Sequence, residues 1–175
     1  MSRRGSRGVT LIELIVCVSM LAILIGLAIP SFATALSTWR RDNAVGDFMA
    51  DLQLARSTAI RTSKVVVMCV SAGGNACDAS NDWRQSWIVF SDLNGNDARD
   101  ANEPLIAQHG PVVGLQLMQS DNNGRRIVFR SNGLLSSGST TVQIQSDGAA
   151  ANELIGIRIN MTGRASLLAL GKKTT

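Results

Sequence analysis

Residues 9–32, VTLIELIVCVSMLAILIGLAIPSF, form one long apolar run in which Glu13 is the single charged residue. Since a helix rises 1.5 Å per residue, about 20 residues cross the hydrocarbon core of a bilayer, and this run is long enough to do so. Arg3, Arg4 and Arg7 precede it, and basic residues beside a membrane helix favour the cytoplasmic side. The sequence therefore predicts a single-pass helix in the cell inner membrane, with the remainder of the chain in the periplasm.

The position of the small residues around this run argues against a conventional secretory signal, which is cleaved after its apolar core. Here the conspicuous processing point, Gly8, comes before the core. Cleavage there would leave the apolar helix on the mature chain and make Val9 the new N-terminus. The alternative is an anchor that is never cleaved.

Glu13 is an unusual residue for an apolar segment, because a carboxylate inside a membrane costs a few kcal/mol unless it lies near the interface or has a partner. One interpretation is a tolerated charge close to the cytoplasmic boundary. The other is an ion pair with a cation of another subunit, for which the α-amino group of Val9 is the candidate. The position of the residue leaves both interpretations open.

The segment at residues 7–14, RGVTLIEL, resembles the signal of type IV prepilins and type II secretion pseudopilins: Gly, usually Phe or Met, Thr-Leu-Ile-Glu and an apolar helix. The resemblance implies cleavage after Gly8 by a prepilin peptidase and N-methylation of Val9. It implies that Glu13 neutralises the N-terminus of a neighbouring subunit during assembly. It also implies other pilins or pseudopilins and an inner-membrane assembly platform as partners. Pro30 stands where this family commonly has a helix-bending proline, whereas Val9 departs from the usual Phe.

Beyond Pro30, apolar residues recur at helical spacing to about Thr62 with charged residues between them, which predicts an amphipathic continuation of the helix. Short β-rich segments follow, and a helix followed by a run of strands indicates an α+β fold with half-buried antiparallel strands. We expect three parts: a leader peptide at 1–8, a transmembrane and assembly helix at 9–36, and a periplasmic globular domain at 37–175. The expected strands are 64–70, 85–90, 105–108, 112–119, 125–130, 141–146, 154–161 and 165–170.

The globular part is similar to the GspH/FimT group of minor pilins and pseudopilins, on the segments 87–90, 92–96, 103–106, 127–129 and 160–164. This resemblance implies a pilin-type domain in which the long helix packs on an antiparallel sheet. It also implies a subunit that assembles into, or primes, a type IV pilus or a type II secretion pseudopilus through its N-terminal helix. Which of these two machines the chain serves stays open.

Cys69 and Cys77 flank a short Gly-rich loop. In an exported domain such a pair predicts a disulfide, and the alternative is two free thiols. The third cysteine, Cys17, lies in the apolar run and is expected to pack as a small hydrophobe. A zinc site is not expected because the single histidine is His109 and no second cysteine pair follows.

A calcium site is the one metal candidate, and a weak one. Its residues stand at positions 1, 3, 5, 9 and 12 of an EF-hand-like spacing, where oxygen ligands could converge on one cation. Position 6, which needs Gly for a sharp turn, is Asp97, and the flanks read as strands. The preferred interpretation is a solvated acidic loop without a metal. The candidate ligands are Asp92, Asn94, Asn96, Asp100 and Glu103.

The net charge of +4 raises the possibility of DNA binding, but without the three leader arginines and Glu13 the remainder carries +2, which does not predict strong non-specific binding. FimT-like minor pilins act in DNA uptake through a C-terminal Gly-Arg-x-Arg motif. Here Gly163 and Arg164 match its start, but Ser166 replaces the second Arg. DNA uptake is therefore the alternative function, with Arg158, Arg164, Lys172 and Lys173 as the possible DNA-binding residues.

Catalytic groupings are not evident. His109 has no plausible nucleophile and acid partners and is expected in a loop, and no Gly-rich phosphate loop is present. The sequence thus predicts a structural protein with no enzyme activity and no cofactor.

Overall fold

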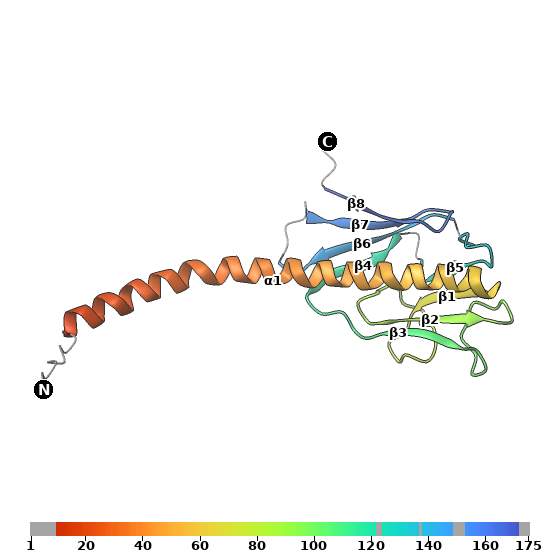
Figure 1. Ribbon diagram of the computed structural model, residues 1–175, viewed down its shortest axis with the longest axis horizontal. Helices are drawn as coiled ribbons and strands as arrows, with labels where there is room; N and C mark the ends of the chain where they lie inside the picture. Colours follow the sequence, from red (N-terminus) through yellow and green to blue (C-terminus); the bar gives the residue numbers. More distant parts are fainter. Residues whose placement is uncertain (1–9, 122–123, 137, 149–152, 172–175) are drawn as a thin grey trace, which may run out of the picture. The chain divides into compact units, whose positions relative to one another are not determined.

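The computed structural model describes residues 10–121, 124–136, 138–148 and 153–171, without the side chains of 27–31 (Figure 1). One long helix is followed by strands, as the hydrophobic periods predict, and the fold is α+β. The elements are α1 (Leu11–Thr62), β1 (Val65–Val70), β2 (Trp87–Asp92), β3 (Leu105–His109), β4 (Leu115–Ser120), β5 (Arg126–Phe129), β6 (Thr140–Ser146), β7 (Ile155–Ile159) and β8 (Ala165–Ala169).

The ends of α1 follow from local chemistry. Thr10 precedes the helix, and its hydroxyl oxygen accepts a hydrogen bond from the backbone N–H of Glu13 at 3.3 Å, which satisfies one of the unpaired donors of the first turn. The helix ends where Ser63 adopts a left-handed φ of 54°. Pro30 lies within α1, but its side chain is outside the described residues, so the bend at Pro30 stays a prediction.

The chain forms two compact units, residues 1–36 and 37–175, and α1 contributes to both. In the first unit every large apolar side chain from Leu11 to Ile25 is exposed, with exposed fractions of 44–79%. Among the described residues, no part of the helical sequence combines the length and the hydropathy of a bilayer-crossing segment.

The strands of the second unit form two antiparallel sheets of four strands each, in the orders β3-β2-β1-β5 and β4-β6-β7-β8. We call them the first and the second sheet. In the view of Figure 1, β1, β2 and β3 of the first sheet lie below the α1 segment of this unit, and β6, β7 and β8 of the second sheet lie above it. In the second sheet β6 alternates as predicted, with Val142, Ile144 and Ser146 buried.

The core of this unit lies between α1 and both sheets. One stripe of the helix supplies six buried residues, Ala44, Val45, Phe48, Leu52, Ala55 and Ala59. Phe48 is at its centre and packs edge-to-face against Trp83 and Trp87, with ring centroids 5.1 and 5.3 Å apart. Every buried apolar residue described belongs to residues 44–159, so the unit contains its own core.

The expectation of half-buried strands is wrong for β1 and β2, which are covered on both faces. A second apolar cluster on the other side of the first sheet contains Val67, Ile88, Phe90 and Val128 together with Cys69, and Cys77 packs against it. The segment that carries Cys77 therefore covers the face that alternation alone would leave to water.

Candidate functional site

Glu13 lies in the first turn of α1 and is exposed. Its negative charge near the helix N-terminus is favourable to the helix dipole. Among the described residues none donates a hydrogen bond to its carboxylate, which is therefore open to a partner from outside this part of the chain. The predicted cleavage and methylation residues, Gly8 and Val9, lie outside the described residues.

Cys69 and Cys77 form a disulfide, which confirms the predicted pairing. The bridge joins buried β1 to the loop that covers the first sheet. Cys17 is free and exposed on α1, so the expectation that it packs as a small hydrophobe is wrong within this single chain. The difference arises because the segment around Cys17 has no packing partner among the described residues.

The proposed calcium ligands form a loop that is held by its own hydrogen bonds. The two oxygens of Asp92 accept the N–H groups of Gly95 and Asp97, and those of Glu103 accept the N–H groups of Leu93 and Asp100, at 2.7–3.0 Å. Both carboxylates are buried, at 3% exposure.

The amide groups of Asn94 and Asn96 donate to the carboxylate of Asp100. Asp97 takes the left-handed φ of 58° that an EF-hand assigns to Gly, a conformation that aspartate tolerates. Over the described ranges, no three His, Cys, Asp or Glu side chains are grouped to hold a metal ion. These hydrogen bonds account for the shape of the loop without a cation.

The predicted DNA-binding residues are only partly described, since Lys172 and Lys173 fall outside the described residues. Arg158 on β7 and Arg164 in the turn before β8 are both exposed. Arg164 and Arg56 of α1 both line a pocket of about 390 Å³. Arg56 was not predicted as a site residue, because its neighbours in this pocket come from the other end of the chain.

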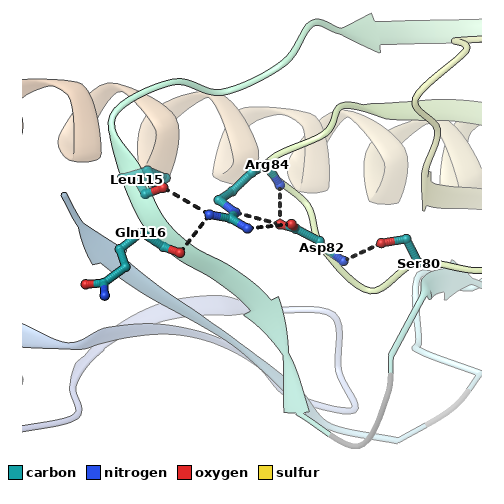
Figure 2. Close-up of polar contacts among 5 residues, drawn as sticks. All are labelled: Ser80, Asp82, Arg84, Leu115 and Gln116. Atoms are coloured by element: carbon teal, nitrogen blue, oxygen red, sulfur yellow. Dashed lines mark hydrogen bonds and ion pairs between the residues drawn. The ribbon is translucent and has the colours of Figure 1, made fainter.

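Asp82 and Arg84 were likewise not predicted, although their spacing of two residues is typical of a side-chain-closed turn. Figure 2 shows Arg84 bonded to Asp82 through two nitrogens, at 2.9 and 2.7 Å, and to the carbonyl oxygens of Leu115 and Gln116. The hydrogen bonds from Arg84 lower the pKa of Asp82, and the carboxylate raises the pKa of Arg84. The ion pair holds the Arg84 side chain within the loop before β2, and the hydrogen bonds from Arg84 to Leu115 and Gln116 join that loop to β4 of the second sheet.

His109 is the last residue of β3 rather than a loop residue. Its ring stacks on Trp87 at a centroid distance of 4.0 Å, and its Nε2 lies 3.2 Å from an oxygen of Asp47 on α1. The indole nitrogen of Trp87 donates to Asp51 at 2.7 Å. These contacts attach the helix to the first sheet and present no nucleophile to the imidazole.

Comparison with solved structures supports the pilin fold. The type IV minor pilin FimU of Pseudomonas aeruginosa PAO1 aligns over 73% of this chain in two crystal forms. Identity is 19% and 20%, coverage of the FimU chain is 87% and 91%, and the TM-scores are 0.59 and 0.57. The minor pseudopilin EpsH of Vibrio cholerae aligns over 76% of this chain and 99% of its own, with 16% identity and a TM-score of 0.49. At 19–20% identity the likeness to FimU shows the fold alone.

Two family models match the sequence, whereas no curated protein sequence is a significant match. Residues 3–29 match the prokaryotic N-terminal methylation motif, which implies anchoring in a membrane. Residues 44–163, more than half of the chain, match the type II transport protein GspH. The chain therefore belongs to the GspH family of pilin-like proteins.

Proposed function

We propose that this chain is a minor pilin or pseudopilin subunit that assembles through its N-terminal helix into a type IV pilus or a type II secretion pseudopilus, or primes that filament. Members of its family are structural subunits that assemble with other pilins or pseudopilins. The observation that carries the proposal is the exposed apolar surface of α1 from Leu11 to Ile25, joined to a globular unit that contains its own core. Such a helix surface requires a packing partner, and the described residues of this chain do not supply one.

The proposal divides the chain into a leader at 1–8, a helix at 9–36 that crosses the inner membrane before assembly, and a periplasmic domain at 37–175. The apolar run, the preceding arginines and the match to the methylation motif support the membrane segment. Val9 and the side chains of 27–31 belong to it but lie outside the described part of the chain. The disulfide is consistent with an oxidising exterior compartment.

In this proposal a prepilin peptidase cleaves after Gly8 and the amino group of Val9 is methylated. The exposed carboxylate of Glu13 then pairs with the N-terminal ammonium of a neighbouring subunit. In the apolar interior of a helix bundle an unpaired carboxylate is costly, so this ion pair would favour the assembled state and set the axial register of the subunits.

The test is Glu13→Ala in cells that produce the whole machine. We expect normal membrane insertion and a processed N-terminus, but at least about a tenfold loss from sheared filaments, because removing one partner leaves a charge buried without its counter-ion. Asp42→Ala removes a carboxylate from a solvent-facing position of the same helix and serves as the matched control. Normal amounts of the Glu13 variant in sheared filaments would contradict the proposal, as would a mature protein that still begins at Met1.

A second candidate function is DNA binding in natural transformation. What supports it is the exposure of Arg158 and Arg164 in the second sheet and its adjoining turn. A gel-shift assay of residues 37–175 with duplex DNA at physiological salt tests it. Binding at micromolar protein that is lost in Arg164→Ala would support this function, and no shift would retire it.

A further inference from the structure

The pocket beside Arg56 lies in the globular unit, between the last turns of α1 and the turn that joins β7 to β8. Its helix residues are spaced three and four apart, so they share one face of α1. Two guanidinium groups and no carboxylate contribute to the described lining, which makes the cavity electropositive. The lining residues are Gln53, Arg56, Ser57 and Ile60 of α1, Gly163 and Arg164 of the turn, and Ala165 of β8.

Arg56 is held in place before any ligand arrives. Its Nε donates a hydrogen bond to the carbonyl oxygen of Gly133 at 3.3 Å. The turn at Gly163, with a φ of 74°, passes so close that an added Cβ would lie 2.5 Å from the same carbonyl oxygen and 2.9 Å from the Nε of Arg56. A guanidinium has five N–H donors, and no described residue accepts from the four on the terminal nitrogens of Arg56.

Arg164 is fixed at its backbone while its side chain stays exposed. Its N–H donates to the side-chain oxygen of Asn160 at 2.9 Å, and its carbonyl oxygen accepts from the N–H of Asn160 at 3.1 Å. Within the described ranges no carboxylate forms an ion pair with it. The pocket thus presents the guanidinium of Arg56, held through its Nε, and the exposed guanidinium of Arg164, two cationic groups of the kind that bind a carboxylate or phosphate group.

The rim of the pocket favours a protein over a nucleic acid as the source of that anion. Ile60 is 49% exposed, and two further exposed apolar residues, Met161 and Leu134, belong to the turns around Gly163 and Gly133. Arginine and methionine are enriched at protein interfaces. Nucleic-acid sites instead spread several cations along a groove to contact successive phosphates. Here two arginines line one pocket, and exposed apolar residues lie beside it.

We propose that this pocket binds a carboxylate side chain of a neighbouring subunit, with Arg56 and Arg164 donating hydrogen bonds to its oxygens. The proposal rests on the assembly function in one respect, since the carboxylate comes from another filament subunit. This contact would be polar and would join the globular domain of one subunit to the next subunit, in addition to the helix contacts around Glu13. Because the two arginines belong to different elements, the site is complete only when α1 and the β7–β8 turn are both in place.

The first experiment uses glutarate as the probe and follows the arginine Nε–Hε signals of the full chain in detergent micelles by NMR. Both Arg56 and Arg164 should shift saturably, and Arg164→Gln should weaken glutarate binding at least about tenfold. Arg126→Gln, at an exposed arginine of β5 outside the pocket, should bind as the parent does. Arg56→Gln provides a second variant, and an unchanged unfolding temperature of Arg164→Gln shows that the fold is kept.

Several results overturn the proposal. The proposal fails if neither arginine signal shifts with glutarate, or if Arg164→Gln binds glutarate as tightly as the parent does. A shift of both arginines with inorganic phosphate or short duplex DNA, but not with glutarate, assigns the pocket to a phosphate ligand instead.

The second experiment measures incorporation into sheared filaments. We expect Arg164→Gln to be several-fold depleted relative to Arg126→Gln, with equal membrane levels and the same processed N-terminus. If Arg164→Gln assembles normally while Glu13→Ala does not, the carboxylate contact between subunits is refuted and the assembly function stands. If Glu13→Ala assembles normally, the assembly function fails, and the glutarate titration still decides the chemistry of the pocket.

Discussion

The two ends of α1 use apolar side chains in opposite ways. From Leu11 to Ile25 these side chains surround the helix and are 44–79% exposed, whereas Phe48, Leu52 and Ala55 form a stripe that is at most 2% exposed. The second pattern is that of a helix that packs on its own domain, with charged residues on the opposite face. The first pattern leaves no polar face toward water, so its apolar side chains need lipid or other helices as packing partners.

This contrast separates folding from assembly within one helix. The globular unit supplies its own cover for the α1 stripe from both sheets, so its stability should depend on residues after 37. The segment before 37 should instead determine whether the protein stays in a membrane or enters a filament. Substitutions in one region should therefore leave the property of the other unchanged.

The largest expected effect on folding comes from Phe48→Ala. Phe48 is fully buried between Trp83 and Trp87, and its loss should lower the free energy of unfolding by about 4 kcal/mol through lost burial and a cavity. Urea unfolding of the full chain in detergent, followed by tryptophan fluorescence, measures this. Leu21→Ala, in the exposed segment, is the matched control and should leave the midpoint unchanged. A comparable loss of stability in both variants would remove the distinction between the two regions.

A smaller effect is expected when the disulfide is opened by Cys77→Ala. The bridge closes a short loop with a sequence separation of 8, for which the loss of chain entropy in the unfolded state gives about 2.5 kcal/mol. The same unfolding assay applies, with Cys17→Ala as the control because Cys17 is free and exposed. Equal midpoints for Cys77→Ala and the parent would show that the loop over the first sheet contributes little to the domain.

Local patterns in the sequence were sufficient to predict the elements of this fold. The Thr-Leu-Ile-Glu segment and the apolar run mark the start of α1, and alternation such as Ile155, Ile157 and Ile159 marks a strand, because helix and strand periods are properties of adjacent residues. The disulfide was also predictable from one short Gly-rich loop between two cysteines. Even so, β2 lies two residues later than expected, at Trp87–Asp92.

Contacts between distant segments could not be predicted in this way. The pocket brings together Arg56, Gly133 and Gly163 from three parts of the chain. The spacing of neighbouring residues cannot predict a contact between a helix residue and turns so far along the sequence. The division of the strands into two sheets and the double-sided burial of β1 have the same origin. They depend on which strands pair and on where the Cys77 segment packs.

The smallest effect is expected for the loop before β2. There Arg84 forms an ion pair with Asp82 and hydrogen bonds to two carbonyl oxygens of β4. Arg84 lowers the pKa of Asp82 below its ordinary value of 3.8, so the folded chain binds this proton less tightly than the unfolded chain does. The stabilisation is therefore complete above pH 3.8 and is lost as the pH falls through the lower pKa of the folded state.

Asp82→Asn should cost about 1 kcal/mol at neutral pH, since the side chain of Arg84 is one-third exposed and solvent screens the pair. Urea midpoints measured from neutral pH down to about pH 2 should then fall less steeply for the variant than for the parent on the acid side. Asp42→Asn, which breaks a more exposed ion pair on α1, should leave both the midpoint and its pH dependence almost unchanged. If the urea midpoints of Asp82→Asn and the parent fall equally steeply at acid pH, the link between the loop and β4 does not depend on this charge.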